Sequence, residues 1–175
     1  GLAYKVYENL VLPAAYFMNA LLPLLAKNLA AGRKLKVQAL WQKAAGLLGT
    51  ASLAGGAVIY LAAPYLIKIL TGGPAGPEIL TLRLLLPALP FAYLNHLAGY
   101  TLIALGEQKK SLIISLGALS FNFFLNLIFV PKFSFAAAAV TTALTELLVL
   151  LLSFKAIAKK AKLSFNINLW PQTAW

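Results

Sequence analysis

The sequence contains no cysteine, one histidine and only four acidic residues, against 15 lysines and arginines. Without cysteine, disulfides and thiolate metal sites are excluded. The carboxylates are not paired, and no Gly-rich loop ends in Lys-Ser or Lys-Thr, so hydrolase, kinase and metal-site signatures are missing. We therefore expect no enzyme activity, no catalytic residue, no metal site and no cofactor.

Charge is also missing from five long apolar stretches. They contain no Lys, Arg or Asp and cover roughly residues 9–26, 44–67, 84–106, 111–130 and 133–154. About 20 helical residues cross the ~30 Å hydrocarbon core of a bilayer. The chain is 61% hydrophobic and 11% charged, with a mean hydropathy of +0.83, which is more apolar than ordinary soluble proteins.

Such a chain is expected to cross a membrane as helices, because lipid offers no hydrogen-bond partners to the backbone. Ten-residue alternating strands, which would indicate a transmembrane barrel, are not visible. The sequence therefore predicts an all-α fold, in which residues 1–175 form a single bundle of five transmembrane helices.

The net charge of +11 does not indicate nucleic-acid binding, because the basic residues lie in the connectors between the apolar stretches. Numbered alternately, the connectors on one side hold Lys5, Lys68, Arg83 and Lys132. The connectors on the other side hold Lys27, Arg33, Lys34, Lys36, Lys43, Lys109, Lys110, Lys155, Lys159, Lys160 and Lys162. By the positive-inside rule the second side is cytoplasmic, which predicts a multi-pass plasma-membrane (inner-membrane) protein with its N-terminus outside and its C-terminus inside.

Some local features refine this topology. Residues 27–43 form a basic amphipathic stretch, expected at the cytoplasmic interface and in contact with anionic headgroups of the membrane lipids. Pro131 is expected to end the fourth helix in a very short reversal. Met18 is the single methionine, so residue 1 is not a translation start. Trp170 and Trp175 near the chain end are interface-type residues that often precede another span. We expect the chain to be a piece of a larger membrane protein.

The order of motifs resembles that of a known transporter family. YKVYEN at residues 4–9 leads to LPLLA at 22–26, IALGEQKK occupies 103–110, and NFFLNLIFVP at 122–131 precedes the Thr pair at 141–142. These motifs are similar to those of oligosaccharide and polysaccharide flippases, in the superfamily that also holds the multidrug and toxin extruders and the lipid II flippases. One departure is FSFA at 133–136, where the family has a Gly-x-x-Gly start.

The resemblance implies helices eight to twelve, the C-terminal half, of a 12- or 14-helix MATE-like transporter. In that family helix eight starts outside and helix twelve ends inside, which agrees with the orientation predicted from charge. The remaining helices of the full-length transporter would then be partners of this chain.

Polar residues within the spans are the functional candidates, because they are costly in hydrocarbon. Glu146 has two interpretations. In the functional one it binds a proton or sodium, or makes a polar contact in a cavity; in the structural one it is a carboxyl buried between helices and bonded to a Thr or a backbone carbonyl. Asn122 and Asn126 are spaced i,i+4 on one helix face. Together with Thr142 they match positions that hold sodium in some lipid II flippases, and the alternative is hydrogen bonding between helices.

Further candidates concern the substrate. Lys5 and Glu8 occupy the outer end of the first span, where the family places a cation facing the central cavity, and Arg83 starts the third span from the same side. Lys and Arg pair with a lipid pyrophosphate, although both side chains also extend to the interface of ordinary spans. Asn95 and His96 lie mid-span. They either bind a sugar or carry a proton, or they pack as a hydrogen-bonded pair.

The sequence thus predicts a transporter that flips a polyprenyl-diphosphate-linked oligosaccharide by alternating access, for cell-surface polysaccharide synthesis. Two alternatives stay open: a small-molecule or drug exporter of the same fold, and a non-transporting subunit that scaffolds glycan enzymes. An exporter of cations would need an acidic, aromatic-lined cavity. A scaffold would not need its polar residues to converge.

Overall fold

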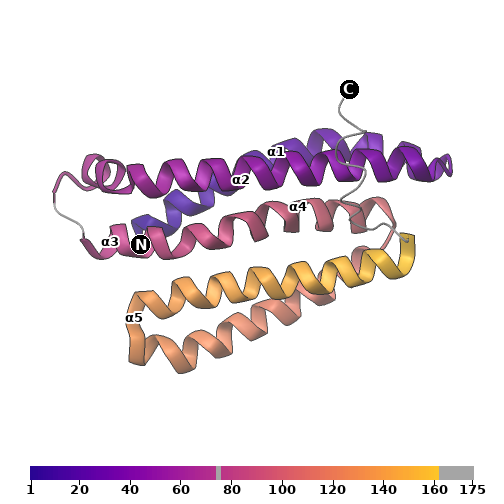
Figure 1. Ribbon diagram of the computed structural model, residues 1–175. Helices are drawn as coiled ribbons and strands as arrows, with labels where there is room; N and C mark the ends of the chain where they lie inside the picture. The colour runs from indigo at the N-terminus through magenta and orange to yellow at the C-terminus, as the bar shows by residue number, and fades with distance from the viewer. Residues whose placement is uncertain (74–75, 162–175) are drawn as a thin grey trace.

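The computed structural model describes residues 1–73 and 76–161, and within these ranges it contains helices and turns but no strand. The helices are α1 (Leu2–Ala30), α2 (Lys34–Thr71), α3 (Gly76–Leu85), the 3-10 turn η1 (Leu86–Ala88), α4 (Leu89–Ala104) and α5 (Gln108–Ala161). They run back and forth in one bundle (Figure 1). The predicted all-α fold is confirmed. Three residues of the sequence analysis lie outside the described residues: Lys162, Trp170 and Trp175.

Helix α5 consists of two antiparallel arms rather than one rod. Its 54 residues would extend roughly 80 Å if unbroken, far more than a bilayer needs. The helix breaks at Ser134, whose φ of 55° and ψ of −140° are not helical, and the chain reverses there (Figure 1). The arm 108–133 contains the fourth predicted span, and the arm 135–161 contains all but the first two residues of the fifth. The expectation that Pro131 ends the fourth helix was wrong, because the helix continues past it to the break at Ser134.

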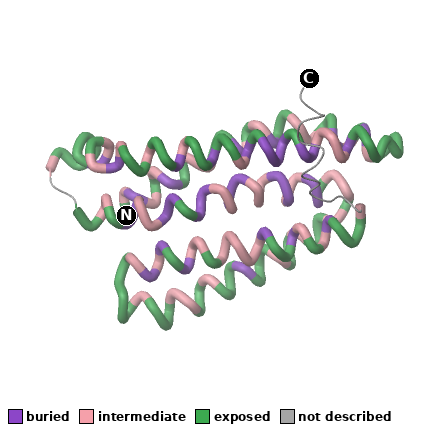
Figure 2. Tube along the Cα trace, in the orientation of Figure 1, coloured by how far each residue is buried: buried purple, intermediate pink, exposed green. Residues whose placement is uncertain are grey.

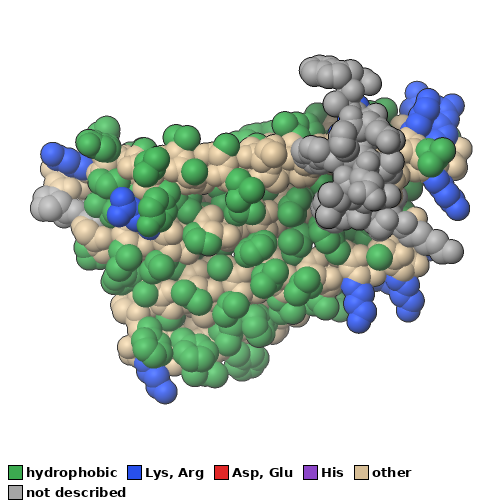
Figure 3. Space-filling model, viewed as in Figure 1, with side chains coloured by type: hydrophobic (Ala, Val, Ile, Leu, Met, Phe, Trp, Pro, Cys, Tyr) green, Lys and Arg blue, Asp and Glu red, His purple; other side chains and the backbone are tan. Residues whose placement is uncertain are grey.

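The helices have the length and the surface of membrane spans. Leu2–Ala30, Lys34–Thr71, Gly76–Ala104 and Gln108–Ala161 are all long and apolar enough to cross a bilayer, and the last provides two crossings. Large apolar side chains cover the outside of the bundle, with Ile69 80% and Leu61 74% exposed. Figure 2 shows exposed residues along α1, α2 and both arms of α5, and Figure 3 shows apolar side chains over the middle of one face with Lys and Arg near the ends. We conclude that this is a multi-pass membrane protein.

Helix α4 lies at the centre of the packing and contacts α1, α2 and α5. Its residues Leu97, Ala98, Thr101 and Leu102 are fully buried, because they face neighbouring helices rather than lipid. The third predicted span is not one straight helix: α3 and α4 are joined by η1, which contains Pro87, and Pro90 follows at the start of α4. Proline removes a backbone donor and bends the span at this point.

The turns at the lysine-rich end share one local design. Gly32 (φ 66°) follows α1 and Gly106 (φ 73°) follows α4, and in each turn two backbone N–H groups close back on the helix end. The N–H of Arg33 donates to Asn28 O at 3.0 Å and that of Glu107 to Leu102 O at 2.8 Å. This is the Schellman pattern, which needs a left-handed residue and therefore favours glycine.

The amphipathic stretch expected at residues 27–43 is not a separate interfacial helix. Its first part ends α1, and from Lys34 onward it forms the first turns of the continuous helix α2. Val37 and Trp41 pack in the core, whereas Leu35 is 87% exposed. Helix packing therefore buries two apolar residues of this stretch, and Leu35 remains at the surface.

Candidate functional site

A carboxylate and an amide meet inside the bundle. Glu146 comes from the second arm of α5 and Asn95 from α4. The Asn95 amide nitrogen donates to Glu146 Oε2 at 2.6 Å and lies 2.8 Å from the backbone carbonyl oxygen of the same residue. The structure therefore brings together two residues that are 51 positions apart in sequence and were predicted as separate candidates.

A cavity of about 210 Å³ opens beside this pair and is lined by α1, α4 and both arms of α5. Its polar lining comprises Asn95, His96, Ser111, Ser115, Glu146 and Ser153. The oxygen Oδ1 of Asn95 is buried and has no hydrogen-bond partner. A carboxylate next to a free amide oxygen offers oxygen ligands of the kind that a proton or a small hard cation takes. Among the described residues no group of three His, Cys, Asp or Glu side chains could hold a metal ion.

Two tyrosines of α1 complete the surroundings of Glu146, and the sequence analysis did not identify them. The hydroxyl of Tyr4 lies 3.2 Å from Thr142 Oγ1, and since Thr142 donates to Ala138 O at 2.9 Å, Tyr4 is the donor of this bond. Tyr7 is buried next to Glu146 with an unpaired hydroxyl. Their i,i+3 spacing places both rings on one face of α1.

Asn122 and Asn126 belong to a second polar group, which joins the two arms of α5. Asn126 donates to Asn122 Oδ1 at 2.8 Å, and Asn122 donates to Thr145 Oγ1 at 2.9 Å. The hydroxyl of Thr141 lies 2.8 Å from Asn126 Oδ1, and that of Thr145 donates to Thr141 O at 2.7 Å. The bonds form a closed ring across the hairpin. Thr142, expected in this group, instead bonds α1 as described above.

The candidates for substrate contact at the opposite end are not joined to one another. Lys5 and Glu8 are exposed on α1 and form no ion pair with a described residue. The Arg83 guanidinium lies 4.8 Å from the centroid of the Tyr60 ring, and its Nε is 3.3 Å from Tyr60 O, so it packs on α2. Glu78, which was not singled out from the sequence, accepts a hydrogen bond from the Ala3 N–H at 2.9 Å.

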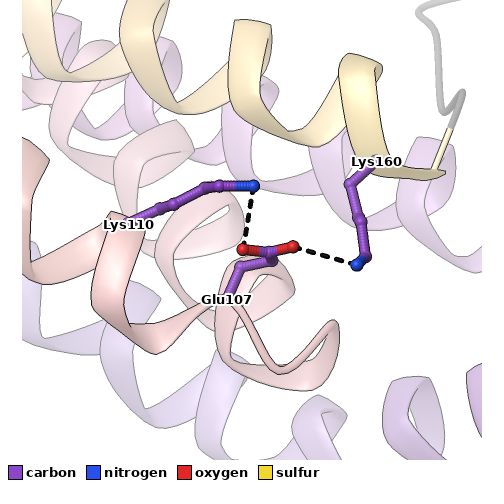
Figure 4. A network of polar contacts seen from close by, with 3 residues as sticks. All are labelled: Glu107, Lys110 and Lys160. Atoms are coloured by element: carbon purple, nitrogen blue, oxygen red, sulfur yellow. Dashed lines mark ion pairs between the residues drawn. The ribbon is translucent and has the colours of Figure 1, made fainter.

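At the lysine-rich end, Glu107 ties the α4–α5 turn to the end of α5. Its carboxylate lies 2.9 Å from Lys110 Nζ and 3.1 Å from Lys160 Nζ, one cation on each side (Figure 4). Hydrogen bonds from Lys110 and then Lys160 lower the pKa of Glu107 below its ordinary value. Lys110 lies at the start of the first arm of α5 and Lys160 at the end of the second arm. Glu107 therefore links the two arms at the end of the hairpin that is farthest from the reversal at Ser134.

The bundle of long apolar helices agrees with the sequence comparison. The sequence model of the MatE family matches residues 1–128, well over half of the chain. The chain belongs to the MatE family. Members of this family are membrane transporters rather than enzymes. No curated protein and no solved structure matches the chain significantly.

Proposed function

We propose that this MatE chain forms the part of an exporter in which ion binding at Glu146 and Asn95 is coupled to movement of the substrate. The observation that carries the proposal is the half-buried pair of Glu146 and Asn95, joined at 2.6 Å beside a polar cavity. An ionisable group within a span is costly, and it is retained where a proton or ion is bound and released. Within this proposal the ion is a proton or Na⁺, both of which oxygen ligands can hold.

The pair also joins two elements that could move against one another. Asn95 lies on the central helix α4 and Glu146 on the hairpin α5. When Glu146 is ionised, the bond from Asn95 is charge-assisted and strong, and protonation or cation binding weakens it. Occupancy of the site would therefore change how firmly the hairpin is held to α4, which is what alternating access requires.

We propose further that the cargo is a polyprenyl-diphosphate-linked oligosaccharide, flipped outward across the plasma membrane for polysaccharide synthesis. Support comes from the resemblance of the motifs at 4–9, 22–26, 103–110 and 122–131 to flippases. Lys5 is exposed on α1, and Arg83 is partly exposed, so both cations are available to a pyrophosphate. The stacking of Arg83 on Tyr60 would orient its guanidinium rather than bury it.

The orientation belongs to the same proposal. Eleven of the 15 Lys and Arg residues lie in connectors of one side, which would be cytoplasmic. The absence of cysteine from these 175 residues makes this easy to test. In a cysteine-free background of the complete protein, Lys132→Cys should react with an impermeant maleimide on intact cells, and Lys159→Cys only after permeabilisation. The reverse pattern would overturn the orientation.

The cargo is tested by a flipping assay with a lipid-linked oligosaccharide and the complete protein in vesicles. Lys5→Ala and Arg83→Ala should each reduce flux roughly tenfold, the effect of losing one charge-assisted contact. Lys68→Ala is the matched control, because Lys68 is an exposed cation of the same end on α2 and should leave flux unchanged. Unchanged flux in both test variants, or transport of an organic cation in place of the lipid-linked sugar, would refute the proposed cargo.

A further inference from the structure

We propose that the groove between the end of α1 and the first turns of α2 binds the phosphate group of an anionic membrane phospholipid. The groove has a volume of about 410 Å³. It is lined by Leu24, Lys27, Asn28, Arg33, Lys36, Ala39, Leu40 and Lys43. Half of the lining is cationic, and none of it is acidic.

The four cations have no counter-ion among the described residues. None of Lys27, Arg33, Lys36 and Lys43 forms an ion pair with a described residue. The sequence contains no acidic residue between Glu8 and Glu78, so neither helix carries a carboxylate near the groove. By contrast, Lys110 and Lys160 at the same end of the bundle share the carboxylate of Glu107. An uncompensated cluster of this kind attracts an external anion, and a phosphate group can pair with several of its cations at once.

The local structure holds the cations on facing surfaces. Lys36 and Lys43 are seven residues apart and therefore two turns apart on the same face of α2. Arg33 is fixed by the Schellman turn, in which Gly32 has a φ of 66° and the Arg33 N–H donates to Asn28 O at 3.0 Å. Asn28 is buried, and its amide donates to Leu24 O at 2.8 Å. The groove is therefore built by the turn between two helices and is not formed by loose surface chains.

The position and the apolar lining favour a lipid over a free anion. Leu24 is 44% exposed on α1, on the side of the groove toward the membrane-spanning part of the helix, and Leu40 lies opposite on α2. A phosphate bound by Arg33 and the lysines would sit at headgroup depth, with an acyl chain along the leucines. Basic pockets between spans on the cytoplasmic side bind anionic headgroups in this way.

The test measures lipid retained by the complete protein, purified from vesicles of phosphatidylcholine and phosphatidylglycerol, by native mass spectrometry. Wild type should retain phosphatidylglycerol above its mole fraction. Lys36→Ala with Lys43→Ala should reduce that retention roughly fivefold for each lysine removed. Lys155→Ala with Lys159→Ala is the control, because both are exposed, lie at the same end and have no ion pair with a described residue. It should retain the lipid as wild type does.

Three results would overturn the proposal. The first is a wild-type protein that does not enrich phosphatidylglycerol. This result needs no variant, so it holds even if the variants fail to fold. Equal loss in the groove and control variants would show diffuse attraction to a charged surface. Full displacement of the lipid by inorganic phosphate at equal concentration would show a free-anion site. Retention by Lys36→Arg with Lys43→Arg, where the charge is kept, supports the proposal.

Discussion

The side-chain nitrogen of Asn95 lies 2.6 Å from Glu146 Oε2 and 2.8 Å from the backbone oxygen of Glu146, so one amide group is within bonding distance of both. This double contact holds the second arm of α5 against α4 near the middle of the bundle. Since the carboxylate is one of the two acceptors, the charge of Glu146 bears directly on the contact between these helices.

Loss of the amide should destabilise the protein. Asn95→Ala removes both contacts and leaves the carboxylate without its donor, which should cost about 1–2 kcal/mol of unfolding free energy. Thermal unfolding of the purified complete protein measures the change. Asn19→Ala is a suitable comparison, because Asn19 accepts a single bond of 2.8 Å from Tyr100 at an exposed position. Equal losses for the two variants would contradict a special role of Asn95.

The amide–hydroxyl ring of the hairpin should behave as one cooperative unit. Asn126→Ala and Thr141→Val each break it, so the double variant should cost less than the sum of the single variants. A double-mutant cycle should give a coupling of about 0.6 kcal/mol, and at most about 1.7 kcal/mol. Additive effects would mean that the 2.8 Å contact contributes nothing to stability.

The same variants separate hydrogen bonding from ion binding in this ring. If the ring only holds the arms together, Asn126→Ala should transport with the same dependence on Na⁺ concentration as wild type. An increase in the Na⁺ concentration needed for half-maximal transport would instead assign Asn126 to an ion site. Initial transport rates in vesicles at several Na⁺ concentrations provide the measurement.

The break in α5 should be more stable with glycine. Ser134 has a φ of 55°, which is unfavourable for a residue with a Cβ, and flippases have glycines in this segment. Ser134→Gly should therefore raise the unfolding free energy by about 1 kcal/mol. Ser120→Gly, on the exposed helical face of the first arm, should lower it by about 0.5–1 kcal/mol. A loss of stability with Ser134→Gly would contradict the assigned backbone conformation.

Glu107 should make stability depend on pH in the acidic range. Its pKa in the folded protein is held below the ordinary 4.5 by Lys110 and Lys160. The stabilisation is therefore complete above about pH 4.5 and is lost as the pH falls through the lowered pKa. Unfolding temperatures measured from neutral pH downward should fall more for wild type than for Glu107→Gln. Glu8→Gln, which removes an exposed carboxyl, should follow wild type.

The sequence was sufficient for the all-α membrane fold because length and apolarity are local properties. Helices α1, α2 and α5 contain the predicted ranges 9–26, 44–67 and 111–130, whereas the range 84–106 is divided among α3, η1, α4 and the turn that follows. The partners within the bundle depend on register and could not be read locally. Spacing placed Asn122 and Asn126 on one face, but the reversal at Ser134 rather than Pro131 sets which threonines lie opposite them. Thr141 and Thr145 take that position, and Thr142 turns toward Tyr4.

Contacts between distant spans were equally out of reach. The sequence identified Arg83 as a cation at the outer end, but its stacking on Tyr60 depends on how α3 packs against α2. Glu146 and Asn95 were recognised separately, because polar residues stand out in apolar stretches, whereas their contact arises from the packing of α4 on α5. Tyr4 and Tyr7 belong to the motif at residues 4–9, but nothing in the sequence placed them near Glu146, since aromatic residues are common in spans.

The most direct test of ion coupling at Glu146 is flipping of a lipid-linked oligosaccharide by the complete protein in vesicles, with and without an imposed proton or Na⁺ gradient. The gradient should accelerate flipping by wild type and by Asn19→Ala. Glu146→Gln keeps the size of the side chain but loses its charge, so its rate should no longer respond to either gradient. An undiminished response of Glu146→Gln would contradict the account.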